Sequence, residues 1–331
     1  MKVRNWVAAG AAAVLATALA ACGVDDEEPG SNGNGEWPEA IVLGLVPSQE
    51  VDQLVEDARV LGDLLATELG IGVETYVPTD YAALVVAMQT GQADIGMFGP
   101  IALVQAADRA GAEITLQSVR RGASSYHTQW FTNNPDRFCM TEVVQAENPE
   151  GNTFSYCNGT APPASEGPQG EDALALIEEG ETVIFVDASS ASGYYYPATQ
   201  IQSVTGMDPL SGIDGQFAGN HQSAVQAVYR GDAEVGVSFD DARNDLVEEL
   251  DDVGEQVVVF AWSSQIPNDG VAISSNLPAD LRAAITDAMT RIIATDEGAQ
   301  AFLDVYNIEG LVPADLAAID VARQVASNFG G

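Results

Sequence analysis

Lysine is almost absent from this chain, and positive charge of any kind is scarce. Of 331 residues, 12 are lysine or arginine and 49 are aspartate or glutamate, and the only lysine is Lys2. The net charge of −37 argues against binding nucleic acid or an anionic membrane through a basic patch, because both need cationic side chains beside phosphate groups. An anionic ligand would have to be met largely by uncharged hydrogen-bond donors.

Histidine and cysteine are scarce too, which limits the metal chemistry open to the chain. There are two histidines, and the three cysteines are Cys22, Cys139 and Cys157. Two thiolates with no histidine nearby in the sequence make a poor zinc site, so we expect no metal and no other cofactor. An exported compartment favours a disulfide between Cys139 and Cys157, which would close a polar surface loop.

An apolar run at the beginning of the chain has the features of a targeting segment. Lys2 and Arg4 precede residues 6–21, which are rich in small side chains and too few for a comfortable membrane span. The run ends in LAACG, which looks like a bacterial lipobox with cleavage before Cys22. We therefore predict a lipoprotein signal peptide over 1–21 and a flexible acylated tether over 22–38. An ordinary secretory signal with an incidental cysteine is the alternative.

Two segments 140 positions apart share one pattern. In 79–100 and again in 220–236, an N-cap residue, Asp80 or Asn220, precedes apolar residues at helical spacing. A glycine then ends the helix, and a short apolar run typical of a buried parallel strand follows. Such a repeat predicts an α/β protein with two equivalent lobes, although any two α/β units look similar at this level of detail.

The same repeat indicates where a ligand would bind. Tyr81 and His221 are the first residues of the two helices, where backbone N–H groups point beyond the helix end and favour an anion. A third segment, 187–194 (DASSASGY), places small and hydroxyl-bearing residues before a helix-like stretch. These residues could let an anion approach backbone donors, or Ser190 could simply cap the helix.

The remaining pattern alternates strands and helices. The predicted strands are 40–47, 73–77, 114–119, 182–186 and 257–263, and the predicted helices are 51–69, 101–110, 173–178, 280–294, 298–304 and 313–329. Segments 126–131 and 264–273 are predicted to cross between the lobes. Lobe 1 then comprises 39–126 and 272–331, and lobe 2 comprises 127–271 with a Gly-, Pro- and Asn-rich insertion over 133–170.

Six short segments of the chain resemble motifs of the substrate-binding proteins of phosphate/phosphite/phosphonate ABC importers. The resemblance spans about 41–310 apart from the insertion, and its marks are 46–48 (VPS), 79–83 (TDYAA), 93–100 (ADIGMFGP), 190–194 (SASGY), 219–221 (GNH) and 262–269 (WSSQIPND). It implies a type II periplasmic-binding-protein fold, in which two α/β lobes joined by two crossing strands close over a ligand in the cleft between them.

The resemblance also implies roles for particular residues. The residues expected to bind the phosphorus oxyanion are Tyr81, Tyr126, Ser190, Ala191, Ser192 and His221. Ser48, Phe98 and Gly99 would line the lobe 1 wall, and Asp241 and Asp269 stand where an acid could face the amine of an amino-phosphonate. Ala191 replaces the usual threonine, and the insertion has no place in the common pattern.

The function implied is capture rather than catalysis. A monomeric lipoprotein on the outer face of the cell membrane would bind phosphonate, phosphite or phosphate and deliver it to the transmembrane subunit of an ABC permease. Ser190, His221 and Asp241 could in principle form a hydrolytic triad, but Ser190 lacks the Gly-x-Ser-x-Gly elbow. A sensory or structural lipoprotein with another ligand, or none, is the other alternative.

The charge imbalance predicts a protein that salt stabilises. Repulsion among the excess carboxylates weakens as the Debye length shortens, so we expect the thermal unfolding midpoint to rise with sodium chloride concentration. Calorimetric scans over a range of salt test this expectation, which accompanies the hypothesis of a high-salt habitat. A midpoint that falls as salt is raised would contradict both.

Overall fold

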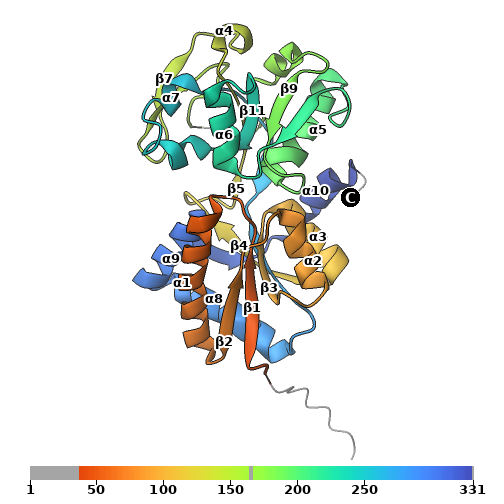
Figure 1. The fold of residues 1–331 in the computed structure, drawn as a ribbon, viewed down its shortest axis with the longest axis vertical. Helices are drawn as coiled ribbons and strands as arrows, with labels where there is room; N and C mark the ends of the chain where they lie inside the picture. Colours follow the sequence, from red (N-terminus) through yellow and green to blue (C-terminus); the bar gives the residue numbers. More distant parts are fainter. Residues whose placement is uncertain (1–36, 164–166, 330–331) are drawn as a thin grey trace, which may run out of the picture. The chain divides into compact units, whose positions relative to one another are not determined.

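The computed structural model describes residues 37–163 and 167–329, which form two α/β lobes (Figure 1). The predicted signal peptide, the acylation site Cys22 and the tether as far as residue 36 lie outside the described residues. Trp37 belongs to the folded part, because its side chain packs against the core and its Nε1 donates to Asp280 Oδ2 at 3.1 Å. The predicted tether of 22–38 thus overlaps the folded part. Within the described ranges, no helix combines the length and apolarity needed to cross a membrane.

Lobe 1 is built on a six-stranded sheet. In spatial order its strands are β15 (Gly310–Pro313), β4 (Glu113–Val119), β14 (Gly270–Ile273), β3 (Ile95–Phe98), β1 (Ala40–Leu45) and β2 (Gly72–Tyr76). The strands β1, β2 and β3 are parallel, whereas β14 runs antiparallel to β3 and β4. The helices of this lobe are α1 (Val51–Leu69), α2 (Tyr81–Gln89), α3 (Pro100–Ala110), α8 (Ala279–Ile293), α9 (Asp296–Tyr306) and α10 (Leu316–Ser327).

Lobe 2 is built on a seven-stranded sheet. Its spatial order is β10 (Asp214–Phe217), β9 (Thr182–Phe185), β11 (Val235–Phe239), β6 (Thr128–Thr132), β12 (Val258–Trp262), β8 (Thr153–Tyr156) and β7 (Val144–Glu147). Its α-helices are α4 (Pro135–Phe138), α5 (Tyr196–Thr205), α6 (His221–Arg230) and α7 (Val253–Gln256), and short turns of other helical types lie at Glu171–Leu176, Ala191–Tyr195 and Ala242–Leu246. The helix predicted at 173–178 is one of these short turns. The strands β7, β8, β10 and β15 were not foreseen.

The sequence repeat is confirmed as a structural repeat. The Asp80 carboxylate accepts from Ala83 N at 2.7 Å, and the Asn220 side chain accepts from Ser223 N at 2.8 Å, so both N-caps form as predicted. Gly231 ends α6 in the left-handed conformation, with φ of 82°. The strand that follows each helix is parallel to a neighbour, β3 to β1 and β11 to β9. Each lobe therefore presents one helix N-terminus in the same structural context.

Two crossing segments join the lobes. The strands β5 (Ser125–Tyr126) and β13 (Ile266–Pro267) pair antiparallel in a small sheet of their own. Figure 1 shows β5 lying between the two lobes. The chain enters the lobe 1 sheet again at Gly270, two residues before the predicted boundary at 272, because the backbone of β14 pairs with β3 from that residue onward.

The insertion is part of the lobe 2 sheet rather than a loose loop. Its hairpin, β7 and β8, extends the sheet beside β12, and the Cys139–Cys157 disulfide is present as predicted. Phe138 stacks on Phe260 with ring centroids 5.0 Å apart, and Phe154 is buried. Apolar packing thus holds the insertion against lobe 2, although its Gly-, Pro- and Asn-rich composition had indicated a polar surface segment.

Loss of the disulfide should destabilise the protein without unfolding it. The bridge joins cysteines 18 positions apart, and closing a loop of that size contributes about 3 kcal/mol in the chain-entropy account. We expect the double variant Cys139→Ser/Cys157→Ser to lose up to that amount of unfolding free energy, measured by denaturant titration. Wild-type protein under reducing conditions is the matched control and should behave like the variant. Unchanged stability in both would contradict the expectation.

Candidate functional site

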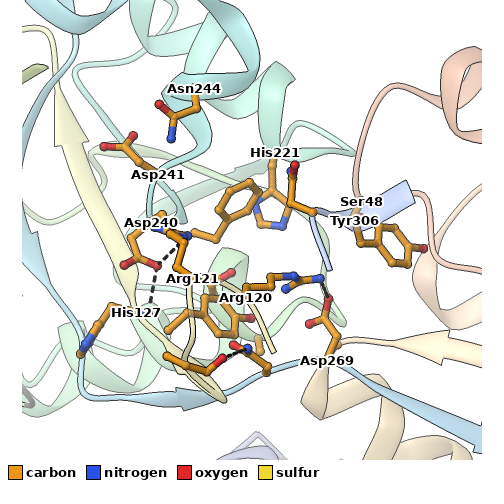
Figure 2. A pocket seen from close by; sticks show the side chains of 18 of the residues that line it. Ser48, Arg120, Arg121, His127, His221, Asp240, Asp241, Asn244, Asp269 and Tyr306 are labelled. Atoms are coloured by element: carbon orange, nitrogen blue, oxygen red, sulfur yellow. Dashed lines mark hydrogen bonds and ion pairs between the residues drawn. The ribbon is translucent and has the colours of Figure 1, made fainter. Parts of the chain in front are cut away.

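A cavity of about 550 Å³ lies between the lobes and contains most of the predicted site. Ten of the eleven predicted ligand-binding residues line it: Ser48, Tyr81, Gly99, Tyr126, Ser190, Ala191, Ser192, His221, Asp241 and Asp269. Phe98 is not among them, because it is fully buried in the lobe 1 core with its ring over Gly96. Figure 2 shows side chains from both lobes converging in this space.

The two repeated helices meet acceptors from the opposite lobe. The N–H of His221, in lobe 2, donates to the carbonyl oxygen of Ser48 in lobe 1 at 3.2 Å. The N–H of Tyr81, in lobe 1, reaches the Asp187 carboxylate of lobe 2. These N–H groups were predicted to hold the anion, but protein oxygens occupy them in this structure. The contribution of each helix to the cavity is therefore its first side chain.

Backbone donors come instead from the turn at Ala191–Tyr195. Ser190 caps this turn by accepting from Gly193 N at 3.0 Å, which leaves its hydroxyl proton able to donate to a ligand. The N–H groups of Ala191 and Ser192, in the first turn, have no acceptor within the helix. Gly193 is required here, since a Cβ would stand 2.3 Å from that of Val186. Capping and anion binding are thus compatible roles for Ser190.

His221 is an uncharged donor at this site. Its side chain is buried, and its Nδ1 lies 2.7 Å from the hydroxyl oxygen of Ser238. Burial, together with the positive charge of Arg120, lowers the pKa of His221 to about 3, so the ring is neutral at physiological pH. When Ser238 donates to Nδ1, the proton resides on Nε2, where it can donate to an anionic oxygen.

Three tyrosines add further uncharged hydroxyls. Burial raises the pKa values of Tyr81, Tyr126 and Tyr306, so all three hydroxyls keep their protons. Tyr126 hydrogen-bonds Ser192, and the hydroxyl of Tyr306 donates to the Val46 carbonyl at 2.6 Å. Tyr306 was not predicted from the sequence because it lies at the end of α9, far along the chain from Tyr81 and Tyr126 and outside the recognised motifs.

Two arginines also line the cavity and were not predicted. Arg120 and Arg121 follow β4 in a tight turn closed by reciprocal hydrogen bonds between Arg120 and Ala123 of 3.0 and 2.9 Å. Arg121 and Gly122 occupy the left-handed region, with φ of 51° and 69°. The sequence could have indicated them, because Arg120 and Arg121 directly follow a predicted strand and precede a glycine, and ligands of α/β folds bind near strand ends.

Both predicted acids have arginine partners. Arg243 binds Asp241 through Nε to Oδ1 at 2.9 Å and through Nη2 to Oδ2 at 2.6 Å, and both side chains are buried. Burial opposes the ionised form, but Arg243 outweighs it and lowers the pKa of Asp241. Asp269 Oδ2 lies 2.6 Å from Arg120 Nη2. A ligand amine would have to share either carboxylate with a guanidinium.

These contacts do not form a hydrolytic triad. The Asp241 carboxylate is held by Arg243, Gln129 and Tyr156, while the His221 Nδ1 is bound to a serine hydroxyl. A triad needs its carboxylate to orient the histidine that deprotonates the serine. The site is arranged for binding.

The insertion reaches the cavity and contacts lobe 1. Glu150, at the tip of the β7–β8 hairpin, lies with its Oε1 3.2 Å from Arg121 Nε. Asn244 holds the hairpin tip by accepting from Asn148 at 2.7 Å and from Asn152 at 2.9 Å. Arg121 also donates to the Asp240 carbonyl, and its Nη2 lies 4.0 Å from Oδ1 of the Asp240 carboxylate (Figure 2). We call Glu150 and Arg121 the clasp, because they join an element of lobe 2 to the lobe 1 rim.

A carboxylate beside the clasp titrates near neutrality. Burial raises the pKa of Asp240 to about 7, against the opposing charge of Arg121. His127 N donates to its Oδ1 at 3.2 Å. The charge of this part of the cavity therefore changes in the physiological range.

Comparison with known proteins agrees with this geometry. Residues 43–318 match the family described as "ABC transporter, phosphonate, periplasmic substrate-binding protein". The chain belongs to this family. It is 26% identical over 317 residues to the phosphate-import protein PhnD of Mycolicibacterium smegmatis, covering 94% of this chain and 88% of that protein. The chain is accordingly an extracytoplasmic substrate-binding protein of an ABC transporter and not an enzyme.

Solved structures show the same fold at low sequence identity. PhnD1 of Prochlorococcus marinus, in complex with methylphosphonate, superimposes with a TM-score of 0.71 at 14% identity, covering 88% of this chain and 98% of that chain. A binding protein component of an ABC phosphonate transporter from Pseudomonas aeruginosa gives 0.69 at 19% identity, covering 88% and 86%. The two-lobed fold predicted from the sequence is confirmed.

The clasp should strengthen ligand binding by favouring the closed arrangement of the lobes. Its side chains are about one-third exposed, so the ion pair is worth about 0.5–1 kcal/mol, and we expect Glu150→Gln to raise the Kd for phosphate about two- to fivefold. Arg121→Gln should have at least this effect, because Arg121 also donates to the Asp240 carbonyl of lobe 2. The double variant should lose no more than Arg121→Gln alone. Isothermal titration calorimetry provides all three values.

A matched control for this cycle lies within lobe 1. Glu68 pairs with Arg291 at 3.0 Å, and neither residue lines the cavity. Glu68→Gln should therefore leave ligand affinity unchanged. Full additivity of the two clasp substitutions, or equal affinity in Glu150→Gln and wild type, would show that the clasp does not assist closure.

Proposed function

We propose that this protein is a membrane-tethered receptor that captures a small phosphorus oxyanion, namely phosphate, phosphite or a phosphonate, and delivers it to an ABC permease. The observation that carries the proposal is the convergence of donors from both lobes on one cavity. Tyr81 and Tyr126 approach from lobe 1 and the crossing segment, whereas Ser190, Ser192 and His221 belong to lobe 2. A ligand touching both sets would hold the lobes together.

The chemistry of these groups suits an oxyanion. A desolvated anion needs several hydrogen bonds, and hydroxyl, imidazole and backbone N–H groups supply them without adding charges that would repel one another. Arg120 contributes one full positive charge beside them. The relatives point the same way, since one is a phosphate-import protein and the structure of another was solved in complex with methylphosphonate.

The attachment to the membrane is a second part of the proposal. Acylation of Cys22 after removal of residues 1–21 would hold the two lobes, as a monomer, near the permease on the outer face of the cell membrane. The acidic and glycine-rich composition of 24–36 suits a tether.

Calorimetric titration of the purified protein with phosphate, phosphite, methylphosphonate and 2-aminoethylphosphonate tests the receptor function. Micromolar or tighter binding of at least one of these ligands is expected. No heat with any of them, from protein shown to be folded by circular dichroism, would contradict the proposal and favour a sensory or structural lipoprotein of the same fold.

His221 should be necessary for tight binding. We expect His221→Ala to raise the Kd of the bound oxyanion at least tenfold, about 1.4 kcal/mol, because one buried donor to an anion is lost. Gln226→Ala, on the same helix but outside the cavity, is the matched control and should not change the Kd. Equal affinity in His221→Ala and wild type would remove His221 from the site.

A further inference from the structure

The C-terminal helix α10 is attached to lobe 1 at its beginning and again further along. Asp315 caps its first turn, and the backbone N of Asp315 donates to Gln117 Oε1 of β4 at 3.2 Å. Arg323, two turns later, binds Asp108 of α3 through Nε to Oδ2 at 3.1 Å and through Nη2 to Oδ1 at 3.0 Å. These contacts fix the direction in which α10 leaves lobe 1.

The end of α10 reaches lobe 2. Phe329 follows the helix, and its backbone N donates to the Ala326 carbonyl at 3.2 Å. Its ring contacts those of Tyr194 and Tyr195, with centroids 5.8 and 5.4 Å apart, and it meets Tyr195 edge to face. Figure 1 shows α10 at the level where the two lobes meet. The segment therefore links the lobes in addition to the crossing strands β5 and β13.

The two tyrosines belong to the turn that carries the backbone donors of the cavity. Tyr195 N donates to the Ser190 carbonyl, five residues back, at 3.1 Å, and such wide helical turns are frequent at functional sites. Tyr194 packs edge to face against Phe185 of β9, with centroids 5.1 Å apart. Ser190 and Ser192 line the cavity, whereas the two tyrosines lie outside it. A shift of the tyrosine rings would therefore move the ligand-binding part of the turn.

Lobe 1 contacts Tyr195 through a second helix. Gln105 of α3 is buried, and its Nε2 donates to the Tyr195 hydroxyl at 3.4 Å. Because Tyr195 moves with lobe 2 while Gln105 and Phe329 move with lobe 1, rotation of one lobe against the other changes both contacts. They are present in an arrangement in which His221 N also bonds the Ser48 carbonyl across the cleft at 3.2 Å. The contacts to Tyr195 thus belong to the closed arrangement.

We propose that Phe329 and Gln105 are positioning residues that couple closure of the lobes to the placement of the backbone donors at 190–192. They touch Tyr195 rather than the ligand, and they stabilise the arrangement in which those donors face the oxyanion. Because ligand binding and these contacts favour the same arrangement, each strengthens the other to the same extent. The inference rests on the proposed function and adds a determinant of affinity outside the cavity.

Calorimetric titration and stopped-flow fluorescence of the purified protein with phosphate and methylphosphonate test the proposal. We expect Phe329→Ala to raise the Kd about three- to tenfold, through faster dissociation, since it removes two aromatic contacts of the closed arrangement. Phe329→Tyr keeps the ring and should bind like wild type. Val321→Ala, at an exposed position of α10, is the matched control and should leave the Kd and both rates unchanged.

Gln105→Leu provides an independent variant on a different helix. It removes the hydrogen bond to Tyr195 and should raise the Kd in the same direction as Phe329→Ala, but by less, because a 3.4 Å hydrogen bond is a weak one. If Phe329→Ala does not fold, Gln105→Leu and the exchange of the wild-type protein still decide.

Amide hydrogen exchange of the whole chain, followed by mass spectrometry, is a readout that a merely structural role would not move. Phosphate should slow exchange over 316–329 of the wild type more than over α8, which packs on α1 and α9 of its own lobe. Phe329→Ala at saturating phosphate should lose this difference, and Phe329→Tyr should keep it. Without ligand, exchange over 190–195 should be faster in Phe329→Ala than in Val321→Ala.

The outcomes separate this inference from the receptor function. Equal Kd values in Phe329→Ala and wild type, or equal slowing of exchange over α10 and α8, would overturn the inference while leaving a phosphorus oxyanion receptor in place. A loss of affinity that Phe329→Tyr does not restore would overturn it too. If no phosphorus ligand binds the wild type, the receptor function fails, and the ligand-free exchange over 190–195 still decides whether Phe329 positions the turn.

Discussion

Burial of an anion inside a strongly acidic protein is the constraint on which the rest of this structure depends. A phosphorus oxyanion that leaves water must be met by donors on every side, and the chain has few cations to offer. The cavity provides tyrosine and serine hydroxyls, a neutral histidine and two backbone N–H groups. Its two arginines, Arg120 and Arg121, each pair with a carboxylate, so their positive charges are compensated.

The same constraint explains why the site is divided between two lobes. Donors on a single surface would leave part of the ligand in water, whereas two helix ends brought together can surround it. The N–H groups of Tyr81 and His221 meet oxygen atoms of the opposite lobe, so hydrogen bonds join the two lobes directly. The paired strands β5 and β13 keep the two halves of the site in register.

The insertion adds a contact between the two lobes. Its hairpin is anchored in lobe 2 by the disulfide and by aromatic packing, and its tip carries Glu150 to Arg121 of lobe 1. An ion pair across the cleft costs little in the open form, where both charges are hydrated, and contributes when the lobes close. The insertion thereby connects the Cys139–Cys157 disulfide of lobe 2 to the Glu150–Arg121 ion pair beside the cavity.

The sequence by itself determined the fold class, the internal repeat and ten of the residues that line the cavity. The sequence shows the helix caps at Asp80 and Asn220 and the short apolar strands, because each of these features depends only on residues that are close together in the chain. The pairing of Cys139 with Cys157 could also be predicted, because few alternatives existed. Ten of the residues expected to bind the ligand do line the cavity, because a sequence motif specifies the local backbone conformation that places its side chains.

Only the tertiary structure decided which charges meet. Arg120 and Asp269 are 149 positions apart, and Arg121 and Glu150 belong to different lobes, so no local pattern joins them. Phe98 belongs to the motif at 93–100, yet its side chain faces the core, because successive strand residues point to opposite sides of the sheet. Long-range pairing depends on how the two sheets and the crossing strands are assembled, and that assembly is not encoded at any one position of the chain.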